Sequence, residues 1–239
     1  SLLICNGYKD SKYIEVATLA RKLGKQPIIV IEQKDEVKRI IEAVKNLKAK
    51  PLLGIRAKLS SKSSGRWSKS VGDNSKFGLS IPEIMSTIKE LKEANLLNEV
   101  KLLHFHIGSQ ISDIAVIKDS LQEASQIYVE LCKLGAPMKY IDVGGGLGID
   151  FDGTKTSSNT STNYSLQNYA NDVIATIKDS CQVNNIDHPT VISESGRAII
   201  SHCSVLIFNV LGTSHVSSKI KISDEKPKSL IIANLIETF

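Results

Sequence analysis

The chain of 239 residues lacks long apolar runs, and no stretch reaches the ~18 consecutive apolar residues that a membrane-spanning helix needs. It shows no signal peptide and no initiator methionine. Aromatic residues are few (5%), and the lysines behind the net charge of +5 are scattered rather than interleaved with them. These absences argue against a membrane protein and against a nucleic-acid-binding protein.

Cysteine is also scarce. The four cysteines, Cys5, Cys132, Cys181 and Cys203, form no C-x-x-C pair and show no regular spacing. This pattern is typical of buried free thiols in a reducing compartment. We therefore expect a cytoplasmic protein, with a plastid as the alternative location in a plant.

What the sequence does contain is an alternation of short apolar runs and amphipathic segments. The hydrophobic fraction of 41% suffices for a sizeable core. The apolar runs are continuous and β-branched, as in parallel strands covered on both faces. Helical patterns lie between them, one with an S-x-x-E capping box at Ser80–Glu83. The expected strands are Leu2–Cys5, Pro27–Ile31, Leu52–Ile55, Leu102–Phe105, Tyr140–Val143 and Val191–Ser193.

This alternation predicts a parallel α/β fold. Because a closed (β/α)8 TIM-like barrel takes ~250 residues, we expect such a barrel, lacking its first strands, over residues 1–203. An open, doubly wound sheet is the alternative. The alternation stops after His202, which predicts the start of a C-terminal β-rich domain over residues 204–239. The chain opens within a strand and ends without a polar tail, so we expect a fragment.

Three segments carry chemical groups at the point where a strand ends and a loop begins. They are His104–Ser109, Asp142–Gly148 and Ser193–Arg197. They offer flat imidazole rings, backbone N–H groups, a carboxylate and a guanidinium. Strand ends build the active site in barrels of alternating strands and helices. The set suits a phosphorylated aromatic cofactor.

The second and third segments each have a functional and a structural interpretation. The glycines of Gly144–Gly148 could form an anion cradle, or simply a tight turn between strand and helix. Glu194 could hold a proton on a ring nitrogen through a charge-assisted bond. Arg197 could bind a phosphate, or could form an ion pair with Glu194.

The first segment places two histidines on one face of a strand, because the side-chain period of a strand is two residues. His104 and His106 could ligate a metal, but no third ligand of the right type lies nearby, so the metal ligands stay unknown. We interpret His104 as a satisfied core histidine. His106 could stack on a cofactor ring, with Ser109 reaching an anion. Arg56 is a cation at another strand end that points at the same mouth.

These motifs resemble those of the biosynthetic arginine decarboxylases, pyridoxal-5′-phosphate (PLP) enzymes with an alanine-racemase-like barrel. The resemblance covers nearly all of residues 1–212. The forms N-G-Y-K-D at Asn6–Asp10 and E-S-G-R-A-I at Glu194–Ile199 favour this family over ornithine and diaminopimelate decarboxylases, which usually have proline where Ser195 stands. Further matching stretches are Gly54–Leu59, Ser75–Leu79, Leu103–Ile111 and Ile141–Asp150.

The resemblance implies a role for each candidate residue. His106 would stack on the PLP ring and Glu194 would pair with the ring nitrogen, and these two are the expected catalytic residues. Arg56 would line the cofactor site. The phosphate would be bound by Ser109, Gly144, Gly145, Gly146, Gly196 and Arg197. The cofactor and substrate loop would consist of Ile141, Asp142, Val143, Gly144, Gly145, Gly146, Leu147, Gly148, Ile149, Asp150 and Phe151.

The resemblance further implies decarboxylation of L-arginine to agmatine and CO₂ for polyamine biosynthesis, a Mg²⁺ requirement, and a homo-oligomer with its active site at the subunit interface. The lysine that binds PLP would lie before Ser1, so we expect the chain alone to be inactive. From the residues alone, Lys9 and Lys58 are alternatives for that lysine. The alternative functions are decarboxylation of ornithine, lysine or diaminopimelate, a non-catalytic PLP-binding homologue, and an NAD-type binding module.

Overall fold

The computed structural model describes residues 2–60, 78–201, 203, 207, 209 and 212. All but the last three belong to one compact unit, Ser1–Cys203, and a second unit, Ser204–Phe239, follows in the chain. The expected β-rich domain over residues 204–239 lies almost wholly outside the described residues, so it stays a prediction.

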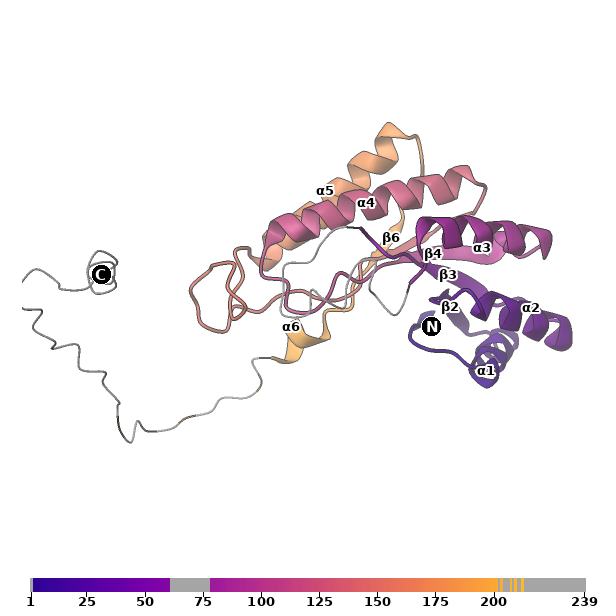
Figure 1. Cartoon of the computed structure of the whole chain (residues 1–239), viewed down its shortest axis with the longest axis horizontal. Helices are drawn as coiled ribbons and strands as arrows, with labels where there is room; N and C mark the ends of the chain where they lie inside the picture. The colour runs from indigo at the N-terminus through magenta and orange to yellow at the C-terminus, as the bar shows by residue number, and fades with distance from the viewer. Residues whose placement is uncertain are drawn as a thin grey trace, which may run out of the picture. The chain divides into compact units, whose positions relative to one another are not determined.

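Six strands form one sheet, and their order in the sheet is their order in the chain (Figure 1). Every neighbouring pair is parallel. All six expected strands are confirmed, with ends that differ by at most two residues. The strands are β1 (Leu2–Cys5), β2 (Gln26–Ile31), β3 (Leu52–Arg56), β4 (Val100–His104), β5 (Tyr140–Asp142) and β6 (Thr190–Ile192).

A helix follows each strand. The Ser80–Glu83 capping box is confirmed, since the Ser80 N–H donates to Glu83 Oε2 at 2.8 Å. Within the described ranges, no helix is both long and apolar enough to cross a membrane. The helices are α1 (Ser11–Lys22), α2 (Glu36–Leu47), α3 (Ile81–Glu93), α4 (Ile114–Lys133), α5 (Leu166–Val183) and α6 (Gly196–Ile200), with a short 3₁₀ helix, η3 (Leu97–Glu99), before β4.

The strand order decides between the two architectures that the sequence allows. A doubly wound sheet reverses its order at a switch point and carries helices on both faces. Here the order never reverses, and helix residues join only one of the two buried apolar clusters. The described unit is therefore a partial (β/α) barrel, as expected, and the doubly wound alternative is wrong.

The two faces of the sheet differ in what covers them. Ile29, Leu53 and Leu103 pack with the helices, whereas the alternate residues form a smaller cluster on the barrel interior, made of Ile28, Val30, Leu52 and Leu102. Gly54 lies in this interior layer, and a Cβ there would come within 2.9 Å of Leu102 Cδ2. Toward the carboxyl ends of the strands, the same interior face becomes polar.

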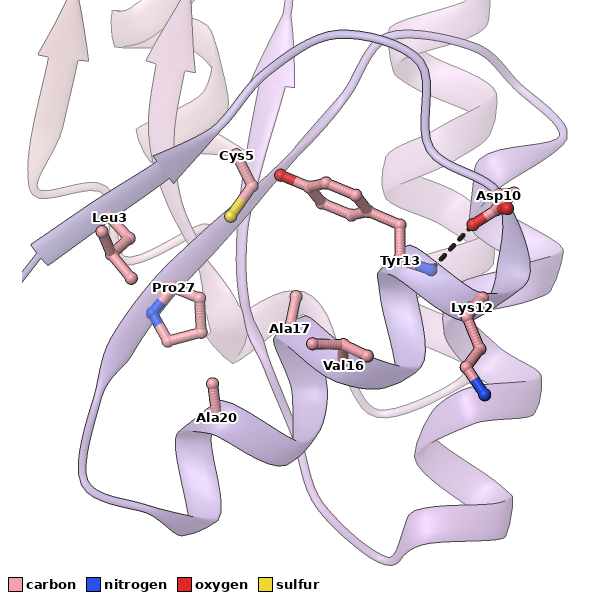
Figure 2. A pocket seen from close by; sticks show the side chains of 9 residues that line it. All are labelled: Leu3, Cys5, Asp10, Lys12, Tyr13, Val16, Ala17, Ala20 and Pro27. Carbon is pink, nitrogen blue, oxygen red and sulfur yellow. Dashed lines mark hydrogen bonds between the residues drawn. The ribbon is translucent and has the colours of Figure 1, made fainter.

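An apolar groove of about 510 Å³ lies between β1 and α1 (Figure 2). Leu3 and Cys5 reach it from the helix-covered face of β1, opposite the interior face. Val16 of α1 lines it with 57% of its surface exposed. The groove is therefore separate from the polar face that the three sequence segments share.

All four cysteines are free, and they differ in burial. Cys181 is buried, Cys5 and Cys132 are half-buried, and Cys203 is exposed. The expectation that all four thiols are buried is thus wrong for three of them.

Lys9 is fully buried, although lysine rarely is. Its Nζ lies 3.3 Å from Glu36 Oε1, both side chains being 0% exposed, and it also donates to the Gly7 carbonyl. The Glu36 carboxylate accepts the Glu32 N–H at 2.8 Å. Burial raises the pKa of Glu36, and the Lys9 charge opposes that rise. Lys9 joins the β1–α1 loop to α2, which argues against it as the lysine that binds PLP.

We expect the Lys9→Met substitution to destabilise the protein by roughly 3–5 kcal/mol, because it leaves the Glu36 carboxylate buried without its partner. Lys12→Met, on the exposed surface of α1, is the matched control and should change the free energy of unfolding by less than about 0.5 kcal/mol. Urea unfolding of the two variants measures both values. Equal stability of the two variants would contradict the structural role of the pair.

Candidate active site

Each of the six strands places one polar side chain at its carboxyl end. These side chains follow the interior apolar layer. Asn6, after β1, donates to Glu194, after β6, and Glu194 also contacts His104 of the central strand β4. The three sequence segments pointed to the positions on β4, β5 and β6, and Arg56 was expected at the end of β3. The six residues are Asn6, Glu32, Arg56, His104, Asp142 and Glu194.

Glu32 and Arg56 form one half of this polar layer. Arg56 Nη1 donates to Glu32 Oε1 at 3.1 Å, and the Gly7 N–H donates to the same oxygen at 2.8 Å. The Arg56 side chain is 15% exposed and that of Glu32 is fully buried. Arg56 therefore lies at the mouth as expected, held by a carboxylate. Sequence reasoning missed Glu32, although a carboxylate at the end of the apolar strand β2 is the signal that identified Glu194.

Glu194 is the centre of the other half. Its Oε1 accepts the Asn6 side-chain amide and lies 3.6 Å from His104 Nε2. The side chain remains 38% exposed. The contact with His104 lowers the pKa of Glu194 to about 2, against the opposing effect of burial. Glu194 is thus an ionised carboxylate, held on one oxygen and open to a ligand.

Asp142 lies beside Glu194 and differs from it in environment. It is completely buried, and its Oδ1 accepts the Gly144 N–H at 2.9 Å. Burial raises the pKa of Asp142 to about 6; His104 opposes that rise, and the negative charge of Glu194 adds to it. The pKa values of the two neighbouring carboxyl groups therefore differ, and between about pH 2 and pH 6 Asp142 keeps its proton while Glu194 is ionised.

His104 corrects two of the sequence interpretations. It is buried, but neither ring nitrogen has a hydrogen-bond partner, so it is not a satisfied core histidine. The sequence also suggested that no further metal ligand lies near His104. In the structure, one ligand atom of each of His104, Asp142 and Glu194 lies within 4.8 Å of the other two, so two carboxyl groups that could bind a cation do lie nearby. They come from β5 and from the residues after β6, about 40 and 90 positions along the chain, and only the parallel sheet brings them together.

His106 lies apart from that cluster, at the open side of the mouth. It is exposed, and its Nδ1 accepts the Gly145 N–H at 3.2 Å. Neighbouring protein atoms and the positive charge of Arg56 lower the pKa of His106. An Nδ1 that accepts a hydrogen bond also carries no proton. His106 is therefore a neutral ring, oriented by the glycine-rich loop.

The glycine-rich loop is packed against two neighbouring loops. A Cβ on Gly144 would lie 2.2 Å from the Phe105 carbonyl oxygen, one on Gly145 2.8 Å from that of Glu194, and one on Gly146 2.5 Å from that of Gly108. Gly144 and Gly146 also have positive φ, of 67° and 98°. The sequence left these glycines as an anion cradle or a tight turn, and the close approach seen at all three is to the chain's own backbone. The loop therefore locks the segments after β4 and β6 together.

The rest of the expected substrate loop is mixed in its environment. Ile141 and Val143 are buried in the main core, and Gln110 holds the backbone of Ile149 through both its Oε1 (3.0 Å) and its Nε2 (2.6 Å). Asp150 accepts the Ser161 hydroxyl, and Phe151 is 57% exposed. Only Asp142 and the glycines thus reach the polar layer by contacts of their own.

The third segment begins α6. Gly196 is the first residue of that helix, and a Cβ on it would meet nothing within 4 Å. Arg197 is exposed, and Glu194 makes its contacts with Asn6 and His104 instead of with Arg197. The ion-pair interpretation is therefore wrong. Ser109 is half-buried in the loop after β4.

Comparison with known proteins matches this geometry to one family. Residues 1–201 match the model of the pyridoxal-dependent decarboxylases, pyridoxal-binding domain. The chain belongs to the pyridoxal-dependent decarboxylases. Over its whole length it is 90% identical to a biosynthetic arginine decarboxylase of Prochlorococcus marinus (strain MIT 9215) and 64% identical to one of Parasynechococcus marenigrum (strain WH8102), and it spans 37% of the length of each.

Solved structures agree. The chain resembles the biosynthetic arginine decarboxylase of Campylobacter jejuni with a TM-score of 0.71 and 35% identity, over 82% of this chain and 31% of that one. It resembles a diaminopimelate decarboxylase mutant of Helicobacter pylori, complexed with L-lysine, with a TM-score of 0.64 and 25% identity, over 83% and 45% of the two chains. The barrel architecture is thus shared by members with different names.

Residues at this mouth fit the pyridoxal cofactor of the family chemically. A pyridine nitrogen calls for an ionised carboxylate, which Glu194 supplies with a pKa lowered to about 2. A flat ring calls for a flat, uncharged partner, which His106 supplies. The exposed guanidinium of Arg197 and the open backbone at Gly196 suit a phosphate.

The glycine contacts make a prediction about stability. Gly144→Ala should cost several kcal/mol, because its Cβ would overlap the Phe105 carbonyl at 2.2 Å and its φ is +67°. Gly196→Ala should change stability by less than about 1 kcal/mol, because its Cβ meets nothing within 4 Å. Thermal unfolding without added PLP tests both. A Gly144→Ala protein as stable as Gly196→Ala would refute the packing role of the loop.

The raised pKa of Asp142 predicts a pH dependence. A carboxyl whose folded pKa is about 6, against 3.8 as its ordinary value, stabilises the fold less as pH rises through that interval. The Asp142→Asn variant keeps a neutral side chain, so its free energy of unfolding relative to the parent should rise by roughly 1–3 kcal/mol between about pH 4 and pH 7.

Unfolding titrations across that pH range, without added PLP, measure the difference. Asp119→Asn, on the exposed surface of α4, is the matched control and should show a constant difference from the parent. A constant difference for Asp142→Asn as well would show that folding does not raise the pKa of Asp142.

Proposed function

We propose that this protein decarboxylates L-arginine to agmatine and CO₂ with PLP, as a step toward polyamines. The observation that supports the proposal is 90% identity, over all 239 residues, to a relative named biosynthetic arginine decarboxylase. The polar layer supports PLP as the cofactor. The sequence forms N-G-Y-K-D and E-S-G-R-A-I support arginine as the substrate.

PLP supplies an electron-withdrawing ring that stabilises the carbanion left when CO₂ departs. The residues of this chain would bind and tune that ring. Glu194 would hold a proton on the pyridine nitrogen, since an ionised carboxylate favours the protonated base. His106 would lie against the ring as a neutral imidazole. Arg56, fixed by Glu32, would keep a positive charge at the mouth.

The phosphate would be bound by the loops that the glycines lock together. Gly144, Gly145 and Gly146 join the segments after β4 and β6, so Ser109 and Gly196 would be presented from a common, rigid edge. Arg197 would add the charge that a phosphate dianion requires. The segment Ile141–Phe151 would continue from this edge as the substrate loop.

The proposal extends to the assembly and its surroundings. We propose a homo-oligomer with its active site at the subunit interface, Mg²⁺ as an additional ion, and a cytoplasmic location. These three rest on the resemblance of the motifs to the arginine decarboxylases.

An assay of the full-length protein with PLP tests the proposal. We expect agmatine from L-arginine and no product from L-ornithine, L-lysine or diaminopimelate run in parallel. Glu194→Gln should lower kcat by roughly 10²-fold or more, because it removes the charge that favours the protonated ring. Glu93→Gln, at the exposed end of α3, is the control and should be unaffected.

Each other result assigns a different function. Product from diaminopimelate, ornithine or lysine in place of arginine would move the protein to another substrate within the same family. PLP binding without product from any of the four would favour a non-catalytic PLP-binding homologue.

A further inference from the structure

His104 is the one histidine of the polar layer that the proposed function leaves without a role. It lies at the end of β4, and its side chain is 2% exposed. Both ring nitrogens lack a hydrogen-bond partner within the part of the chain that the structure describes. Burying a polar ring without partners costs free energy, so a nearby group must offset that cost.

The nearest charged partner of His104 is Glu194. The Nε2 to Oε1 distance of 3.6 Å is slightly longer than a hydrogen bond, and a shift of a few tenths of an ångström would close it. The other group on that oxygen is the Asn6 amide, which lies in the loop after the edge strand β1. His104 belongs instead to a central strand that pairs on both sides, opposite Arg56 and Asp142.

Asp142 closes the cluster from the other side. It is fully buried, its Oδ1 is taken by the Gly144 N–H, and its Oδ2 has no partner among the described residues. Asp142 therefore makes no hydrogen bond to Glu194 within the described residues. His104 Nε2, at 3.6 Å from Glu194 Oε1, can attract that carboxylate as a cation or as a neutral donor.

We propose that His104 is a positioning residue, which holds the carboxylate of Glu194 in place and ionised so that it can face the pyridine nitrogen of PLP. This inference rests on the proposed role of Glu194 and goes beyond it, since His104 itself would touch neither cofactor nor substrate. Loss of the Nε2 contact should therefore weaken recognition of the ring nitrogen and leave the rest of the cofactor site intact.

Two substitutions separate the two ring nitrogens. The side-chain amide of glutamine can take the place of Nε2, whereas the shorter asparagine reaches only as far as Nδ1. His104→Gln should thus keep a donor toward Glu194, and His104→Asn should lose it. Both variants carry the same polar amide group. His188→Gln, in the exposed loop before β6, is the control.

The measurement is the dissociation constant of the full-length apoenzyme for PLP and for deaza-PLP, the analogue in which a C–H group replaces the ring nitrogen. Absorbance titration gives both values without any turnover. The preference for PLP is the dissociation constant for deaza-PLP divided by that for PLP. We expect the parent, His188→Gln and His104→Gln to prefer PLP. We expect this ratio to be at least tenfold lower in His104→Asn, close to that of Glu194→Gln, while the affinity for deaza-PLP stays unchanged.

Two results would overturn the proposal. If His104→Asn keeps the parent preference while Glu194→Gln loses it, His104 only packs beneath the site. If the parent itself shows no preference for PLP, Glu194 does not recognise the ring nitrogen, and the inference fails with it. Neither result depends on the substrate, so failure of the arginine assay alone leaves the test of His104 intact.

Discussion

The parallel, in-order pairing of six strands is the constraint on which the rest of the structure depends. Because each strand runs in the same direction, the carboxyl ends all lie at one edge, and alternate residues of every strand face the interior. The pairing of His104 with both Arg56 and Asp142 fixes which residues stand level with one another. A shift of one residue in any strand would turn its polar end residue outward, into the helix-covered core.

The two halves of the resulting polar layer carry their charges differently. On one side, Glu32 is neutralised by Arg56 and supported by the Gly7 N–H. On the other side, two carboxyl groups lie close together, and burial raises the pKa of Asp142 to about 6 while that of Glu194 is lowered to about 2. This arrangement leaves one exposed anion and one partly exposed cation at the mouth. A cofactor with a basic ring nitrogen and an anionic phosphate complements that pattern.

The loops beyond the strands hold the layer together through backbone contact. Gly144 and Gly146 allow the chain to pass within van der Waals distance of the segment after β4, and the Glu194 N–H donates to the Gly144 carbonyl at 2.8 Å. The orientation of Glu194 thus depends on the same loop that orients His106. A pyridoxal-binding domain gains rigidity in this way, since the groups that would face the cofactor share one scaffold.

The sequence alone determined the element order, the barrel class and the strand-end positions of Arg56, His106, Gly144 and Glu194, because apolar periodicity and glycine placement are local signals. It could not determine the partners of His104, since Asp142 and Glu194 lie about 40 and 90 residues away along the chain. Nor could it show that Glu32 holds Arg56, that Lys9 is paired with Glu36, or that the glycines face neighbouring loops. Those relationships arise only when parallel pairing brings distant strand ends to one edge, and burial there raises the pKa of Asp142 above that of Glu194.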